Sequence, residues 1–175
     1  MTTSNGSTMK WKEQLINLFI NKKIKIKRDA KSENTSFGIH LAIFTEPFLS
    51  LLFEGKKTME SRFSINKIRP YQNVSEGDII FIKKSGGPVC GYFVAGKVFY
   101  FLNSKKNIDE IKVKYSNQIC TGYVNRFWEE RKNSKYITLI EITDLIQLNP
   151  INIEKKDRTA WVIIRNADSS SQLLV

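Results

Sequence analysis

The stretch TEPFLSLLFEGKKTMESR, residues 45–62, carries the clearest structural signal in this 175-residue chain. Thr45 is placed to cap a short helix, and Pro47 suits the first helical turn. Gly55 stands where that helix should end, because glycine readily adopts the left-handed backbone conformation of a helix C-terminus. Residues 58–63 then alternate as a strand does. The stretch therefore predicts a short helix followed directly by a strand.

The predicted strand carries two charges of opposite sign on one face. Alternation places Thr58, Glu60 and Arg62 on the same side of the strand. Lys57 lies at the strand entry, where alternation does not fix its direction. One interpretation is a surface ion pair on the outside of a sheet, which contributes little stability. The other is a polar pocket floor that holds a planar, hydrogen-bonding ligand, and spacing alone leaves both open.

The flanking sequence predicts a mixed arrangement of strands and helices. Gly91 and Gly96 interrupt a long apolar strand, and such glycines commonly mark the bulges that let a sheet curl and close. This pattern favours a barrel over a flat sheet. The expected strands are 39–44, 58–63, 79–82, 89–101, 137–142 and 161–164, with a hairpin turn at 85–88 and helices at 10–20, 104–115 and 121–132.

Charge is concentrated near the N-terminus. Residues 1–37 contain eight basic and three acidic residues, so their net charge is +5 out of +11 for the chain. Within them, residues 1–9 read as a disordered lead. The basic run is either a nucleic-acid-binding arm or a solvated tail. We expect three parts: a basic N-terminal extension and linker over 1–37, one domain over 38–165, and a C-terminal tail over 166–175.

Composition narrows the class of protein. A charge of +11 and a pI near 9.7 favour RNA, DNA or an anionic surface as partners, or simply describe a soluble basic protein. Cys90, Cys120 and His40 are isolated, so neither a structural zinc site nor any other metal or cofactor is expected. Such cysteines are typical of a reducing compartment. No apolar run predicts a membrane span or a signal peptide, and a cytoplasmic location is expected.

The pattern Gly-x-Lys-x-x-Glu-x-Arg, written GKKTMESR over residues 55–62, resembles the signature of ASCH domains. The preceding Pro47 with its apolar helix resembles that family's opening, as does Glu76-Gly77-Asp78 before an apolar strand. The likeness extends over about 38–101 and more weakly to residue 164. The resemblance implies an α+β fold: a PUA-like mixed β-barrel of five to six strands with helices packed outside. It also implies a cleft between the first helix and the sheet.

The resemblance also implies roles for the signature residues. Lys57 would contact a phosphate or base, Glu60 would bond a ligand edge, and Arg62 would orient Glu60 or meet an anion. We therefore expect a protein that binds RNA or a modified nucleoside, with DNA possible. The alternative is an ASCH-type hydrolase, either a ribonuclease or an acylated-cytidine amidohydrolase, with Lys57 and Glu60 catalytic and Glu60 as general base.

This chain departs from the amidohydrolase subgroup at one position. The threonine of that subgroup falls where this chain has Glu60, and Thr58 instead lies on the same predicted face, as a candidate ligand contact. A third possibility is a regulatory or interaction protein with a vestigial cleft. The sequence leaves open the ligand, the choice between binding and catalysis, and the oligomeric state.

Three further features have two interpretations each. Lys83, Lys84 and Ser85 precede two glycines and either cradle a phosphate or form a plain hairpin, without P-loop spacing. Trp161 either lines the cleft or closes the barrel. His40 reads as an isolated strand residue with no partner for catalysis.

Overall fold

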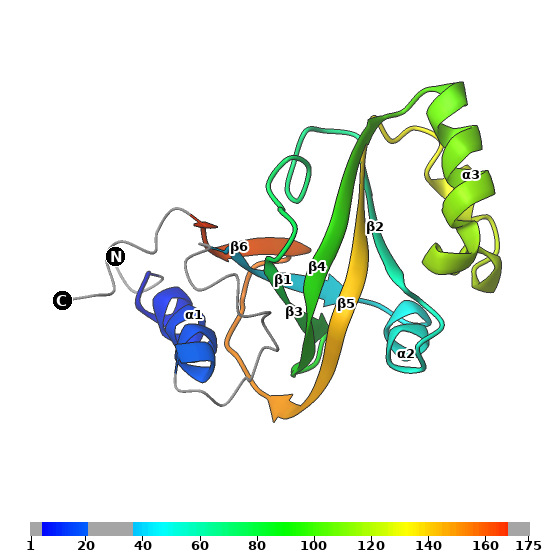
Figure 1. Ribbon diagram of the computed structural model, residues 1–175. Helices are drawn as coiled ribbons and strands as arrows, with labels where there is room; N and C mark the ends of the chain where they lie inside the picture. Colours follow the sequence, from blue (N-terminus) through cyan, green and yellow to red (C-terminus); the bar gives the residue numbers. More distant parts are fainter. Residues whose placement is uncertain (1–4, 21–36, 168–175) are drawn as a thin grey trace, which may run out of the picture.

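The computed structural model describes residues 5–20 and 37–167, and within them it forms one curled, mixed sheet with helices on both sides (Figure 1). The six strands lie in the order β2-β5-β4-β3-β1-β6. The expected α+β architecture is confirmed; the barrel is an open half-barrel whose edges are β2 and β6. The elements are α1 (Asn5–Ile20), β1 (Ile39–Phe44), α2 (Phe48–Phe53), β2 (Met59–Ser64), β3 (Ile79–Lys84), β4 (Val89–Leu102), α3 (Lys105–Ile119), the 3₁₀ turn η1 (Thr121–Tyr123), α4 (Phe127–Glu130), β5 (Tyr136–Ile151) and β6 (Trp161–Arg165).

One pair of neighbouring strands in the sheet is parallel. β1 runs parallel to β3, while the β1–β6, β3–β4, β4–β5 and β2–β5 pairs are antiparallel. Residues 79–82 of β3 are fully buried, as expected for a strand that is apolar on both faces and covered on both.

The curl of the sheet comes from bulges in its longest pair. The β4–β5 register shifts between Val89 and Gly91 and again between Ala95 and Val98, a step that spans Gly96. A Cβ atom on Gly91 would lie 2.6 Å from the carbonyl oxygen of Ile146, so only glycine allows this close approach. The glycines therefore do what their positions predict: they let two long strands bend together.

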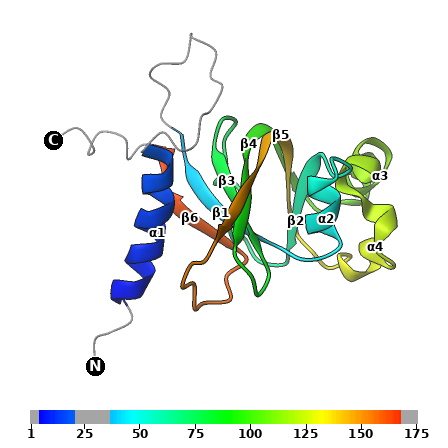
Figure 2. The same cartoon turned by 90° about the horizontal axis from the view of Figure 1, so that it is seen from below.

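The two faces of the sheet bury separate cores. Alternation along β1 sends Ala42 and Phe44 toward α2, and Ile39 and Leu41 toward α1. On the α1 side, Trp11 and Leu15 are buried against the sheet. Figure 2 shows α1 on one side and α2, α3 and α4 on the other. The helix α1 therefore contributes to the core of the sheet although it precedes the expected domain boundary at residue 38.

Several local predictions were wrong. The helix α1 begins at Asn5, inside the expected disordered lead. Thr45 is not the N-cap of α2: Pro47 occupies that position without a side-chain cap. The helix expected over 121–132 is broken into η1 and α4, because Arg126 adopts a left-handed backbone conformation with φ +61°. The strand expected over 137–142 is the longer β5.

Other expectations concern residues outside the described ranges. The basic run and linker over 21–36 and most of the expected tail, 168–175, are among them. Within residues 5–20 and 37–167, no helix has the length and apolar character needed to cross a membrane.

Candidate functional site

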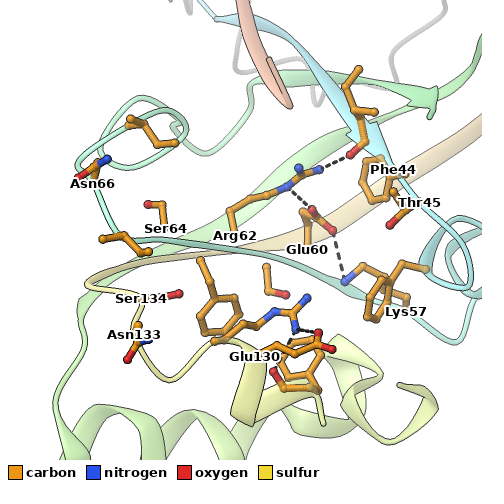
Figure 3. A pocket seen from close by; sticks show the side chains of 18 residues that line it. Phe44, Thr45, Lys57, Glu60, Arg62, Ser64, Asn66, Glu130, Asn133 and Ser134 are labelled. Carbon is orange, nitrogen blue, oxygen red and sulfur yellow. Dashed lines mark hydrogen bonds and ion pairs between the residues drawn. The ribbon is translucent and has the colours of Figure 1, made fainter. Parts of the chain in front are cut away.

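A cavity of about 670 Å³ opens along β2 (Figure 3). The strand β2 forms its floor, the end of β1 and the helix α2 form one wall, and α4 with residues 131–134 forms the other. Lys57, Glu60 and Arg62 lie on the floor of this cavity, and spacing alone had left both a polar pocket and a surface ion pair open. The cavity is also lined by four phenylalanines: Phe44, Phe48, Phe63 and Phe127.

Glu60 is the centre of the polar floor. Its side chain is 5% exposed, and each carboxylate oxygen meets a cation. Oε1 accepts a hydrogen bond from Arg62 Nε at 2.6 Å, and Oε2 lies 3.3 Å from Lys57 Nζ. Burying a carboxylate is costly unless it is paired and hydrogen-bonded, and both conditions are met here.

Lys57 is buried together with Glu60. Its ammonium donates to the carbonyl oxygen of Met59 at 2.7 Å and lies 5.2 Å from the centre of the Phe48 ring. Burial lowers the pKa of Lys57 from its ordinary value, because the apolar surroundings disfavour the charged form more than Glu60 favours it. Lys57 is therefore a lysine that gives up its proton more readily than one in water.

Arg62 links the cavity floor to the rest of the sheet. Its Nη2 donates to the carbonyl oxygen of Ile43 at 2.9 Å, and its guanidinium lies 5.4 Å from the Phe44 ring and 5.3 Å from the Trp161 ring. The side chain is 20% exposed, so it is fixed by its neighbours yet open to the cavity. A planar cation held between aromatic rings is well placed to meet an anion or a base edge.

A third cation, Arg131, lines the cavity directly after the end of α4. Arg131 stacks on the Phe127 ring with 3.8 Å between the guanidinium carbon and the ring centre, and donates to the Phe127 carbonyl oxygen. Burial lowers the pKa of Arg131, partly offset by Glu130 at 3.6 Å. Three cations and two carboxylates line the cavity, so it carries an excess of one positive charge when all are ionised. The cavity thus favours an anionic or electron-rich ligand.

The other predicted contacts lie outside this cavity. Thr58 is exposed and does not line it, although its backbone N–H donates to the Gln118 carbonyl oxygen. Lys83, Lys84 and Ser85 form the end of β3 and its hairpin and do not line it either. The Lys83 ammonium donates to backbone carbonyl oxygens within that turn. Their role as ligand contacts stays a prediction.

The structure adds a buried chain of hydrogen bonds that the sequence does not show. Trp161 Nε1 donates to His40 Nδ1 at 3.3 Å, and His40 Nε2 lies 3.0 Å from Asp78 Oδ2. Since an indole can only donate, Nδ1 accepts from Trp161, and Nε2 is the ring nitrogen that donates to the Asp78 carboxylate. The pKa of Asp78 is lowered because hydrogen bonds from His40 and from the Ser75 and Gly38 amides outweigh burial, which acts to raise it.

This chain of hydrogen bonds supports the site. His40 has hydrogen-bond partners, Asp78 directly before β3 and Trp161 in β6. Trp161 both fills the core, as barrel closure requires, and lies beneath the Arg62 guanidinium. Sequence gave no signal for this contact, because His40 and Trp161 are 121 residues apart. Arg131, which also lines the cavity, lies in the segment 121–132 that was expected to be helical, and the lining residues Asn133 and Ser134 directly follow that segment.

Comparison with known proteins identifies the fold. No protein-family model and no curated protein matches the chain. Among solved structures, ASCH from Zymomonas mobilis aligns with a TM-score of 0.57 at 13% identity, covering 75% of this chain and 91% of that one. A serine-to-alanine variant of the same protein aligns with a TM-score of 0.58 at 13% identity, covering 79% and 96%. The chain therefore has the fold seen in these ASCH structures.

Proposed function

We propose that the cavity binds one nucleoside unit, either within RNA or as a free modified nucleoside. The observation that carries the proposal is the buried Glu60, held between Lys57 and Arg62 on the floor of an aromatic-walled cavity. A nucleobase offers a flat apolar face and a polar edge. The cavity offers phenylalanine rings for the face and an ordered carboxylate–guanidinium pair for the edge.

The size of the cavity agrees with this ligand class. Its volume of about 670 Å³ lies within the range of about 300–1,000 Å³ that is usual for small-molecule pockets. A pocket of this kind accepts an unstacked base and not a base pair, which is how proteins usually read RNA. Asn133, Ser134 and Arg131 at the opposite wall supply polar groups for a ribose or phosphate.

The test compares two arginines of different surroundings. Arg62→Gln removes the charge from the cavity floor, and Arg126→Gln removes the same charge from an exposed site outside the cavity. Binding of ribonucleosides, ribonucleoside monophosphates and short RNA is measured by calorimetry. We expect Arg62→Gln to weaken binding by about tenfold or more, since a hydrogen bond to a charged group contributes about 1.5–3 kcal/mol. Equal effects of the two substitutions would contradict the proposal.

A second candidate function is hydrolysis, and the buried Lys57 with its lowered pKa favours it. A lysine whose pKa is lowered by burial can act as a base or a nucleophile. Glu60 is the other catalytic candidate, although both of its oxygens already meet cations. General acid–base assistance contributes about 10²–10⁴-fold in rate.

The discriminating experiment is a turnover assay on RNA and on an acylated cytidine. Hydrolysis by the purified protein, reduced by about 10²-fold or more in folded Glu60→Gln, would establish the enzyme. Binding without turnover in both proteins would leave the binding proposal alone. Circular dichroism of each variant confirms that the loss is not caused by unfolding.

A further inference from the structure

The cavity does not end at Arg62. A smaller pocket of about 130 Å³ adjoins it at the Arg62 side chain, and a second groove of about 680 Å³ adjoins that pocket in turn. Arg62 lines both the cavity and the smaller pocket, Trp161 lines the smaller pocket and the second groove, and Ile68 lines all three. Because they share these lining residues, the three hollows adjoin one another and mark out a path, with Arg62 lining the smallest of them.

The far groove has the charge that a phosphate backbone requires. Lys67 and Arg69 line it, and none of its lining residues is acidic. Both side chains are exposed, and neither forms an ion pair with another described residue. The carboxylate of Asp157, next to the groove through its hydrogen bond to the Thr159 amide, is already paired with Lys155 at 2.8 Å.

The loop that forms the groove has a defined shape. Turns within it are closed by hydrogen bonds from the Ile68 amide to the Asn66 carbonyl oxygen and from the Tyr71 amide to the Ile68 carbonyl oxygen. Its far end is fixed by the Val74 amide, which donates to the Tyr100 hydroxyl at 3.0 Å. Lys67 and Arg69 are thus presented on an ordered segment, and a ligand need not organise the loop before it binds.

We propose that single-stranded RNA follows this path, with one base in the cavity and the adjoining phosphates at Lys67 and Arg69. The inference rests on the proposed function and makes it narrower: the ligand is a nucleotide within a strand, not a free nucleoside. Ile68, 58% exposed at the junction, offers an apolar surface to a sugar or base. A positively charged groove joined to aromatic surfaces is the usual arrangement for unpaired strands.

The experiment separates the groove from the cavity. Fluorescence anisotropy and calorimetry compare the four ribonucleoside monophosphates with an eight-nucleotide RNA of randomised sequence. They are measured on the full chain, on Lys67→Gln/Arg69→Gln, on Arg62→Gln, and on the control Lys112→Gln/Arg126→Gln. The control removes the same charge from exposed residues outside the three hollows.

The proposal predicts that the octamer binds more tightly than any monophosphate. Lys67→Gln/Arg69→Gln should weaken octamer binding by about tenfold, lower its salt slope by about 1.4, and leave monophosphate binding unchanged. Arg62→Gln should weaken binding of both ligands. The control should change neither.

Other outcomes separate the two proposals. Octamer and monophosphate binding of equal strength, both lost in Arg62→Gln, would overturn the strand path and leave the proposed function intact. Octamer binding that is insensitive to Arg62→Gln would overturn both, as would the absence of binding to every probe. An equal loss of octamer binding in the control would show that any exposed positive charge contributes as much as Lys67 and Arg69, and would overturn the strand path.

Discussion

Glu60→Gln should destabilise the folded protein because it leaves two cations on the cavity floor without their counter-charge. The amide oxygen still accepts a hydrogen bond from Arg62, but the negative charge beside Lys57 disappears. Removing one partner of a buried ion pair typically costs about 3–5 kcal/mol in the free energy of unfolding. Water reaches Arg62, so its unpaired charge contributes less to this cost. Lys57 can release its proton, which lowers the cost further. We therefore expect about 3 kcal/mol near neutral pH.

The pH dependence of this loss identifies Lys57 as its source. Burial lowers the folded-state pKa of Lys57, so the unfolded chain binds more protons at pH values between the folded and unfolded pKa. Stability therefore rises as pH increases through the folded pKa. Without Glu60 that pKa falls further, and the variant gains stability at a lower pH than the wild type. The deficit of Glu60→Gln should be smaller at pH 9 than at pH 6.

Urea denaturation followed by circular dichroism measures this effect. With an m-value of about 2 kcal/mol/M, the transition midpoint should fall by about 1.5 M at pH 6. The matched control is Glu130→Gln, a carboxylate of the same cavity whose side chain is 59% exposed, which should shift stability by less than about 0.5 kcal/mol. Lys57→Met combined with Glu60→Gln should regain about half of the loss. A wild-type midpoint in Glu60→Gln, or a deficit equal at both pH values, would refute the reasoning.

Three further substitutions test the scaffold around the site. Trp161→Phe leaves the buried Nδ1 of His40 without its donor and should lower the unfolding free energy by about 1–3 kcal/mol in urea titrations, while an unchanged midpoint would exclude the hydrogen bond as a stabilising contact. The pKa of Asp78 is lowered in the folded protein, so the Asp78 carboxylate stabilises the fold at pH values above its ordinary pKa, and this stabilisation is lost as pH falls through the folded pKa. Asp78→Asn should therefore show a smaller drop in urea midpoint between pH 6 and pH 3 than the wild type. An equal drop would contradict this. Gly91→Ala places a methyl group 2.6 Å from a carbonyl oxygen of β5 and should lower the free energy of unfolding by about 1–3 kcal/mol. Gly55→Ala should cost less, because its methyl group meets no atom and only the backbone at φ +73° is strained. The reverse order in thermal or urea unfolding would refute this.

The strands were largely predictable because their signals are local. Apolar runs bounded by turn residues placed β1, β3, β4 and β6 within a few residues of their observed bounds. The glycines of β4 predicted the bulges that curl the sheet. The break between η1 and α4 was not predictable, because the left-handed conformations of Cys120 and Arg126 depend on packing. The length of β5 likewise depends on pairing with a partner strand across the sheet.

Some residues of the candidate site could likewise be predicted from the sequence, and others could not. Glu60 and Arg62 follow from two-residue alternation on one strand, so their shared direction was readable from the sequence. Lys57 was not, since it precedes the regular strand and is directed by its bonds to backbone carbonyl oxygens. The aromatic and basic wall from α4, and the support of Arg62 by Trp161, arise only when distant segments meet.

The pairing of β1 with β6 determines when the cavity can be completed during synthesis. β1 is made early, near residue 40, but its antiparallel neighbour is not made until residues 161–165. Until then a growing chain lacks the indole that lies under Arg62 and hydrogen-bonds His40. Contacts of such long sequence separation form late, because the intervening chain must first be ordered. A nascent chain on the ribosome therefore cannot support Arg62 as the folded protein does before β6 has emerged, so the arginine of the cavity floor reaches its final surroundings only at the end of translation.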